Sequence, residues 1–318
     1  MTKVSILMAV YNAEFKLSNT IQSIKNQSLK DFECIIVDDG SEDRTLEYLN
    51  QLDDNRFKVI RSSHQGLTKS LNLGLRKCSS EYVARIDADD QSSSDRIKKQ
   101  SEYLDKYKDI VAVGSSVQIL NNKNSIIREV NYPTSHHKLK KMYTKKMNSL
   151  PHSSLMLRKD KLIELGGYRE IFKKAQDYDL VLRLTEIGKI GSIKKPLCQL
   201  RYDNNSITNN LNGNLQVEYS VMALISHYYR NIYNKDPLSD KSTSIFLDKF
   251  AKWYESSIYP RTFLSRIARN NMKKNLSEGK IFDLTLELFN SLKFDMFWPI
   301  RTYLGYDFHL KKWVKNNY

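Results

Sequence analysis

Residues 82–90 read Tyr82-Val83-Ala84-Arg85-Ile86-Asp87-Ala88-Asp89-Asp90, an apolar run that ends in three carboxylates. The apolar run predicts a buried strand. Carboxylates this close together repel one another unless a cation or hydrogen bonds compensate. A divalent cation with oxygen ligands does so, and it can also hold a diphosphate and act on it as a Lewis acid. The alternative is a solvated turn in which Asp90 caps a helix.

Two earlier strands end in polar residues in the same way. Val4–Val10 precedes Tyr11-Asn12, and Phe32–Val37 precedes Asp38-Asp39-Gly40-Ser41. A carboxylate at the second position can accept the imide N–H of uracil or bond a ribose hydroxyl. The alternative is an Asp/Gly turn with a helix N-cap.

Helical spacing of apolar residues separates these strands, which gives the rhythm of βαβ units. The expected helices carry Leu17, Ile21 and Ile24, then Leu46, Leu49 and Leu52, and, after a strand at Phe57–Ile60, Leu67, Leu71 and Leu75. Alternating strands and helices predict a parallel sheet with right-handed crossovers. The carboxyl ends of its strands share one edge, where such folds bind ligands. We therefore expect the three polar clusters to converge on one crevice.

The rest of the chain divides into two parts that differ in their predicted secondary structure. Residues 101–208 are mixed, with strands expected at Ile110–Leu120 and Ser153–Leu157 and a helix at Asp177–Ile187. From about Asn209 strand signals fade, and helical segments rich in aromatic and basic residues run to residue 318. The expected boundaries are therefore 1–100, 101–208 and 209–318.

Composition bounds the class of protein. With 318 residues, 40% hydrophobic and 27% charged, wholesale disorder is excluded. The three cysteines, Cys34, Cys78 and Cys198, show neither disulfide nor zinc spacing, which fits a reducing compartment. The net charge of +15 implies an anionic partner: a nucleotide, a nucleic acid or a membrane. The sequence contains no transmembrane stretch of about 18 apolar residues, and Val4–Val10 is too short for a signal peptide.

Taken together, these residues resemble the family 2 glycosyltransferases, which have the GT-A nucleotide-sugar fold. Order and spacing match over roughly residues 3–207, and several motifs in register are far more specific than any one of them. The segments that carry the resemblance are Val4 to Asn12 with Glu14, Ile35 to Ser41 with Asp43 and Thr45, Gly66-Leu67, Asn72-Leu73-Gly74, Tyr82 to Asp90, Pro151 to Ser154, Leu165 to Tyr168, and Gln176 to Leu180 with Arg183.

The resemblance implies an α/β fold with a mixed, mainly parallel sheet flanked by helices and followed by a C-terminal helical extension. Residues 1–100 would form the nucleotide-sugar-binding half and 101–208 the acceptor and catalytic half. Asp89 and Asp87 would hold Mn²⁺ or Mg²⁺, with Asp87 near the ribose. Asp177 would be the base that deprotonates the acceptor hydroxyl, so that direct displacement inverts the anomeric carbon; Asp179 is the next candidate. The remaining donor-binding residues implied are Val10, Tyr11, Glu14, Asp39, Lys69, Arg85 and His152.

Some positions depart from the family pattern. Gln176 stands where Glu is common, His64 where Asn is common, and Asp203 where His is common. Leu71 replaces a frequent Arg, and we expect Lys69 to supply that positive charge toward the diphosphate. His152 is open between a structural and a site role. The basic run Lys138–Lys146 is open between a solvated face and a flank for anionic groups.

The C-terminal part is open between a packed helical subdomain and a membrane-binding segment from about residue 260 onward, because it mixes aromatic with basic residues. The expected partners are a nucleotide-sugar donor, a glycan or lipid-linked acceptor and an anionic membrane surface, with no nucleic acid. The expected location is cytoplasmic, peripheral on the inner face of the cytoplasmic membrane. Two other classes remain: a metal-dependent nucleotidyltransferase, although Ala9 to Glu14 has no glycine-rich phosphate loop, and a basic nucleic-acid-binding protein.

Overall fold

The computed structural model describes residues 2–121, 124–146, 150–201, 213–239, 242–254 and 307–317. The chain forms two compact units, one of Met1–Tyr143 with Asn148–Asn209 and one of Thr144–Met147 with Asn210–Tyr318. The second unit thus starts next to the position where strand signals fade in the sequence.

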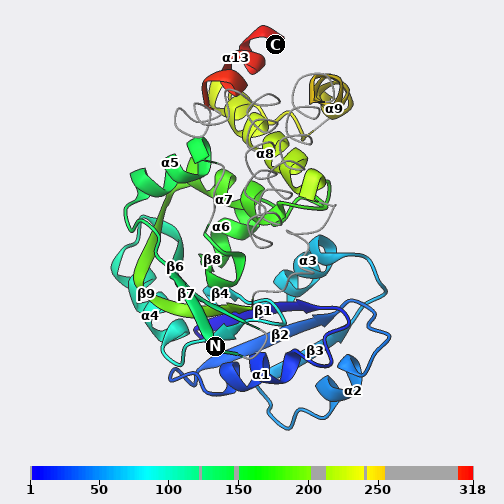
Figure 1. Ribbon diagram of the computed structural model, residues 1–318, viewed down its shortest axis with the longest axis vertical. Helices are drawn as coiled ribbons and strands as arrows, with labels where there is room; N and C mark the ends of the chain where they lie inside the picture. Colours follow the sequence, from blue (N-terminus) through cyan, green and yellow to red (C-terminus); the bar gives the residue numbers. More distant parts are fainter. Residues whose placement is uncertain are drawn as a thin grey trace, which may run out of the picture. The chain divides into compact units, whose positions relative to one another are not determined.

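The first unit is built on one mixed sheet with the strand order β3-β2-β1-β4-β8-β6-β9-β5, and β7 pairs with β6 (Figure 1). The strands are β1 Val4–Val10, β2 Phe32–Asp38, β3 Phe57–Arg61, β4 Tyr82–Arg85, β5 Gln91–Ser92, β6 Ile110–Leu120, β7 Ile126–Val130, β8 Met156–Arg158 and β9 Lys189–Arg201. The neighbours β3, β2, β1 and β4 run parallel. This confirms the parallel sheet predicted for the first part of the chain and brings the carboxyl ends of β1, β2 and β4 to one edge.

The second half of the sheet mixes directions. β8 runs antiparallel to both β4 and β6, while β6 and β9 are parallel. β5 and β7 are short antiparallel additions, on β9 and on β6. The helices of this unit are α1 Leu17–Lys25, α2 Thr45–Asn50, α3 Leu67–Lys77, α4 Arg96–Lys106, α5 His136–Lys146, α6 Lys159–Glu164 and α7 Gln176–Ile187.

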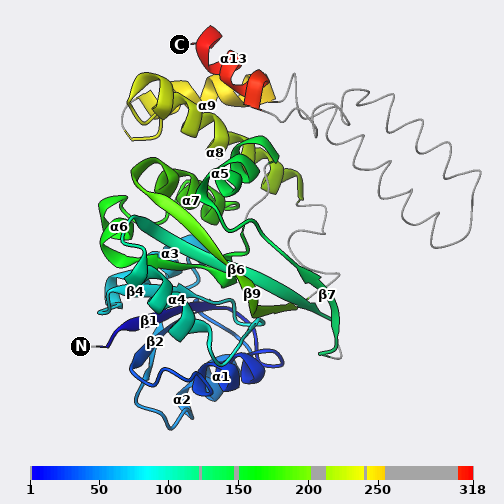
Figure 2. The ribbon, with the colours of Figure 1, turned by 90° about the vertical axis from the view of Figure 1, so that its left-hand side faces the viewer.

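Alternation along the strands decides which helix covers which face. Met8 of β1 belongs to the core cluster that contains Leu17 and Ile21 of α1. Leu7, its neighbour, points to the opposite face, where a Cβ on Gly74 of α3 would lie 2.4 Å from its Cδ1. Figures 1 and 2 show α1 and α2 on one face and α3 on the other. Gly74 therefore lets α3 lie directly on the sheet.

One predicted strand was partly wrong. In place of a strand at Ser153–Leu157, the chain forms a 3-10 turn at His152–Ser154 and then β8 at Met156–Arg158. Ser154 Oγ donates to the carbonyl of Pro151 at 2.8 Å, which closes the turn. The hydroxyl of Ser153 is used by the site described below, so neither serine continues the ladder.

The basic run lies on α5, where apolar and basic residues separate. Leu139, Met142 and Tyr143 are buried, while Lys138 and Lys141 are exposed. These two lysines form a solvated face, and nothing in the described chain assigns them an anionic ligand.

The second unit is helical in its described part, with α8 Gly213–Tyr233, α9 Ser242–Trp253 and α13 Asp307–Asn317. Trp313 of α13 is buried and packs on α9, with its ring centroid 6.4 Å from Phe246 and 5.1 Å from Trp253. Trp313 thus serves the packing of this unit. The predicted membrane segment lies mostly outside the described residues. In the described part, no helix is both long and apolar enough to cross a bilayer.

Candidate active site

Hydrogen bonds join the loops that follow β1 and β2. The backbone N–H groups of Asn12, Ala13 and Glu14 donate to side-chain oxygens of Ser41 (3.0 Å), Thr45 (2.7 Å) and Asp43 (3.2 Å). In return, the N–H groups of Glu42 and Arg44 donate to the side chains of Asn12 (2.9 Å) and Glu14 (3.0 Å). Asn12 has a φ of 48°, a left-handed conformation that asparagine tolerates well. Most motif residues of these two loops therefore build the scaffold of the edge.

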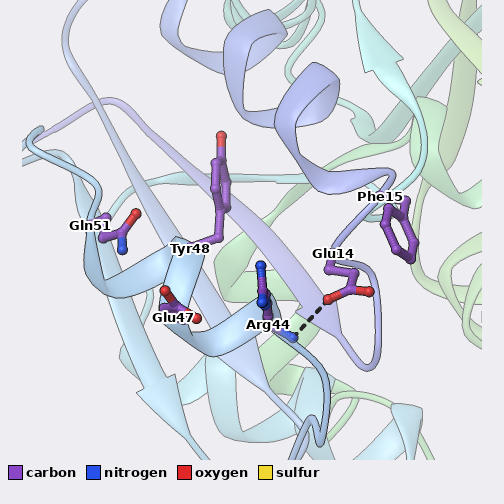
Figure 3. Close-up of a pocket in the computed structure, with 6 residues that line it drawn as sticks. All are labelled: Glu14, Phe15, Arg44, Glu47, Tyr48 and Gln51. Atoms are coloured by element: carbon purple, nitrogen blue, oxygen red, sulfur yellow. Dashed lines mark hydrogen bonds between the residues drawn. The ribbon is translucent and has the colours of Figure 1, made fainter.

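Glu14, predicted to bind the donor, uses its carboxylate to accept the N–H of Arg44. It also lines a groove of about 530 Å³ together with Phe15, Arg44, Glu47, Tyr48 and Gln51. Figure 3 shows the Glu14 carboxylate directed at Arg44, with the Phe15 ring at the other side of the loop. None of Asp87, Asp89 or Asp177 lines this groove.

Asp39, predicted to contact uracil or its ribose, is buried and accepts three hydrogen bonds from the start of α3. The donors are the N–H groups of Gln65 (3.0 Å) and Gly66 (2.9 Å) and the hydroxyl of Ser70 (2.7 Å). Asp39 therefore holds the turn that leads into α3 and does not act as a helix cap. A nucleotide would have to share the carboxylate with these donors.

An aromatic pair stands beside Asp39 at the end of β1. The rings of Tyr11 and His64 lie 4.2 Å apart, and Tyr11 is 43% exposed. His64 Nδ1 lies 3.1 Å from the carbonyl oxygen of Asp39, to which it donates in the Nδ1–H tautomer. Val10 is buried, and its carbonyl accepts the N–H of Asp39 at 2.8 Å. The exposed Tyr11 ring is therefore the surface here on which a base can stack.

Asp87 is held at both carboxylate oxygens. Arg85 donates to Oδ1 from Nη2, and Ser153 Oγ donates to Oδ2 at 2.8 Å. Burial opposes the charge of Asp87, but the Arg85 guanidinium, His152 and the hydrogen bond from Ser153 together outweigh it, so the pKa of this carboxyl is lowered. Arg85, predicted to bind the donor, is itself fully buried and has its Nε and Nη1 without a hydrogen-bond partner. It acts in this structure as the internal counter-charge of Asp87.

The next two carboxylates differ from Asp87 and from each other. Asp89 keeps 36% of its side chain exposed and lies 3.9 Å from Lys16 Nζ. Burial and the charge of Asp87 raise its pKa. Asp90 is buried, and burial with the charges of Asp87 and Asp89 raises its pKa to about 8. It accepts the N–H of Arg201 at 3.0 Å, so it ties the loop to β9 and does not cap a helix.

A metal ion would be held here by Asp89, with Asp87 beside it. Among the residues with a described placement, no group of three or more His, Cys, Asp or Glu is arranged to hold a metal. Asp87 accepts a hydrogen bond at each oxygen but keeps 40% of its side chain exposed, and Asp89 keeps 36%. One carboxylate with a bound diphosphate and water fits the way Mg²⁺ is commonly held.

Asp177 lies in the first turn of α7, where the helix dipole favours a carboxylate. Ala175, the residue before α7, has a φ of 54°, a left-handed conformation that costs free energy for a residue with a Cβ. Burial raises the pKa of Asp177, and the charge of Asp87 adds to this. A raised pKa brings a carboxylate closer to the working range of a general base.

Asp179, the other candidate base, has a different role. It is fully buried and accepts from Arg183 Nε at 2.9 Å. Arg183 also donates to the carbonyls of Leu165 (2.9 Å) and Gly167 (2.8 Å). This ion pair therefore fixes the Gly-Gly turn before Tyr168, and Asp179 is not presented to a substrate.

His152 contacts the side chain of Tyr168. Its Nε2 lies 2.8 Å from the Tyr168 hydroxyl. Burial and the Arg85 charge lower the pKa of His152 to about 3, so the ring is neutral near pH 7. Asn72 of α3 holds Tyr168 by two backbone hydrogen bonds, at 2.7 Å to its carbonyl and 2.9 Å from its N–H. Lys69, in the first turn of α3, is exposed.

Three residues around these carboxylates, Ser153, Tyr168 and Lys16, had no predicted role. Ser153 and Tyr168 lie in quoted motifs, so the signal for them was present but their partners were not visible. Lys16 belongs to no motif, and only the fold brings it to Asp89.

The chain is similar to known glycosyltransferases. The sequence profile described as Glycosyl transferase family 2 matches residues 5–166. The O-antigen biosynthesis glycosyltransferase WbnJ of Escherichia coli is 34% identical over 204 residues, 63% of this chain and 78% of that protein. The putative glycosyltransferase EpsE of Bacillus subtilis is 31% identical over 249 residues, 75% of this chain and 85% of that protein.

Among solved structures, residues 1–349 of S. aureus TarS in complex with UDP-GlcNAc align with a TM-score of 0.60 at 15% identity. The alignment covers 94% of this chain and 92% of that one. This likeness confirms the predicted GT-A fold, and the profile match confirms the predicted family. The chain therefore belongs to glycosyl transferase family 2 and is a glycosyltransferase.

Proposed function

We propose that this glycosyltransferase moves a sugar from a UDP-sugar donor to a glycan or lipid-linked acceptor in the biosynthesis of a cell-surface polysaccharide, with inversion at the anomeric carbon. The observation that carries the proposal is that two carboxylates, the part-exposed Asp89 and Asp177 on α7, both lie within the electrostatic influence of Asp87, whose charge together with burial raises the pKa of each. The two can serve the two ends of a displacement, the leaving group and the acceptor.

In this proposal Asp177 accepts the proton of the acceptor hydroxyl while its oxygen forms a bond to the anomeric carbon. The bond from that carbon to the diphosphate breaks at the same time, and UDP leaves with the bonding electrons. Attack from the side opposite the leaving group inverts the configuration, and no covalent enzyme intermediate is needed. Asp179 cannot replace Asp177, because Arg183 holds it inside the fold.

The donor would lie along the carboxyl edge of β1, β2 and β4. The Tyr11 ring offers a stacking surface for the base, and Asp39 lies next to it. Asp89 would hold Mn²⁺ or Mg²⁺, which when bound stabilises negative charge on the departing diphosphate. Support for UDP comes from the TarS complex with UDP-GlcNAc, and support for the pathway from the O-antigen and amylovoran biosynthesis glycosyltransferases among the relatives.

The test of the donor and metal assignment is the affinity for UDP-GlcNAc, measured by calorimetry with and without Mn²⁺. Wild type should bind more tightly with Mn²⁺, and Asp89→Ala should lose that gain while its melting temperature stays near that of wild type, because Asp89 is part-exposed. Asp160→Ala is the matched control, an exposed aspartate on α6. Full activity in EDTA, or an unchanged Mn²⁺ effect in Asp89→Ala, would show that the metal is not held here.

We also propose that the C-terminal part contacts an anionic membrane. The support is its mixture of aromatic and basic residues, of which Lys311 and Lys312 are exposed on α13. Sedimentation with anionic and neutral liposomes at low salt tests it, and equal recovery in both would refute it. Membership of the family leaves the nucleotidyltransferase and nucleic-acid-binding alternatives without support.

A further inference from the structure

Lys16 is the residue immediately before α1, and its ammonium faces the carboxylate of Asp89. Its Nζ lies 3.9 Å from Asp89 Oδ2, and the two side chains are 41% and 36% exposed. Lys16 and Arg201 both favour the charged form of Asp89, and Lys16 has the larger effect. Asp87, two residues earlier, has its own cation in Arg85. Each carboxylate of the Asp-x-Asp motif is thus matched with a different basic side chain.

The backbone of Lys16 is held in place by the frame of the site. The N–H groups of Lys16 and Leu17 both donate to the carbonyl of Ala13 at 3.0 Å, and Ala13 is itself bonded to Thr45. On the other side, the buried hydroxyl of Thr20 in α1 donates to the carbonyl of Ala88 at 2.9 Å. Because the same helix carries Lys16 and binds the Asp89 loop, their proximity is built into the fold.

A lysine and a divalent cation cannot both neutralise one carboxylate at full strength. A cation on Asp89 repels the ammonium, whose long side chain can move several ångströms without moving its backbone. A diphosphate held by that cation offers the displaced ammonium a new anionic partner at the same place. The exchange needs no rearrangement of α1.

On the basis of the proposed function, we propose that Lys16 is a donor-binding residue that neutralises Asp89 in the donor-free enzyme and transfers to the donor diphosphate when a cation occupies Asp89. Lys16 therefore weakens cation binding before the donor arrives and strengthens diphosphate binding. The consequence is that metal and nucleotide bind together more readily than metal binds alone.

The experiment measures Mn²⁺ affinity of the intact chain by electron paramagnetic resonance, without nucleotide, and UDP affinity by calorimetry, at a saturating Mn²⁺ concentration. Lys16→Met should tighten Mn²⁺ binding and weaken UDP binding, each by about fivefold, which corresponds to about 1 kcal/mol for two unit charges near 4 Å in water. Lys16→Arg keeps the charge and should stay within twofold of wild type in both. Lys30→Met is the control, since it removes an exposed lysine that precedes β2, at the opposite edge of the sheet.

Mn²⁺ affinity of Lys16→Met equal to that of Lys30→Met would overturn the pairing with Asp89. Unchanged UDP affinity would overturn the transfer to the diphosphate. Failure of the proposed function is a separate result, since then wild type would bind no Mn²⁺ even with saturating UDP. A melting temperature for each variant shows that folding is not the cause of any change.

Discussion

Replacing Asp39 by Asn tests whether this carboxylate contacts a ligand, holds the turn before α3 by hydrogen bonds, or does both. The carboxylate accepts from Gln65 N–H and Ser70 Oγ through Oδ1 and from Gly66 N–H through Oδ2. Asparagine retains one acceptor oxygen and places an NH₂ group against the donors of the other. At least one hydrogen bond to a charged acceptor is lost and a buried donor is left unpaired.

The expected cost is about 2–3 kcal/mol, from the value of a hydrogen bond to a charged group and of an unpaired buried donor. For a folded unit of this size that lowers the melting temperature by roughly 4–12 °C. The assay is thermal unfolding without any nucleotide, with Asp53→Asn as control because Asp53 is exposed on the surface. A normal melting temperature together with lost UDP binding would refute the structural role and make Asp39 a ligand contact alone.

Two further predictions concern other parts of the sheet edges. Gly40 and Gly66 both have positive φ, of 77° and 93°, but a Cβ on Gly40 would lie 2.9 Å from His64 N while Gly66 has open space. Gly66→Ala should therefore cost about 1–3 kcal/mol for its backbone conformation and Gly40→Ala about 1–3 kcal/mol more for the clash; equal losses in urea unfolding would contradict this. Burial opposes the charge of Glu33, but hydrogen bonds from Lys58, Ser5 and Ser79 lower its pKa from 4.5 to about 2. Because the folded pKa is the lower one, its stabilisation is complete above pH 4.5 and lost toward pH 2. Melting curves should show a smaller loss over that range in Glu33→Gln than in wild type, and parallel curves would contradict the prediction.

The fold could be predicted to the extent that each element has its own local pattern. Leu17, Ile21 and Ile24 are all buried on α1, as their spacing indicated. The turn at His152–Ser154 could not be predicted, because the Ser153 hydroxyl in it donates to Asp87, which lies 66 positions away in the sequence. Tertiary partners of this kind leave no trace in a local period.

The site could be predicted as a location but only partly as a set of roles. The strand ends do meet at one edge, as chain order implied. A carboxylate at a strand end can cap a helix, join two loops by hydrogen bonds or bind a ligand, and the sequence does not separate these possibilities. Glu14 and Asp39 therefore remain predictions as ligand contacts, although the structure gives each a scaffold partner. Arg85 had a basic side chain in the correct motif, but its complete burial depends on the packing around β4.

The most direct test of the central claim is the effect of Asp177→Asn on turnover and on donor affinity, measured on the same protein. The assay follows UDP release from UDP-GlcNAc in the presence of an acceptor extract of bacterial glycans and glycolipids. The account predicts a rate lower by about 10² to 10⁴, the usual contribution of one general base, with the dissociation constant of UDP-GlcNAc unchanged. Asp160→Asn, also an aspartate in the first turn of a helix, should behave as wild type. A rate for Asp177→Asn within threefold of wild type would contradict the account and place the base elsewhere.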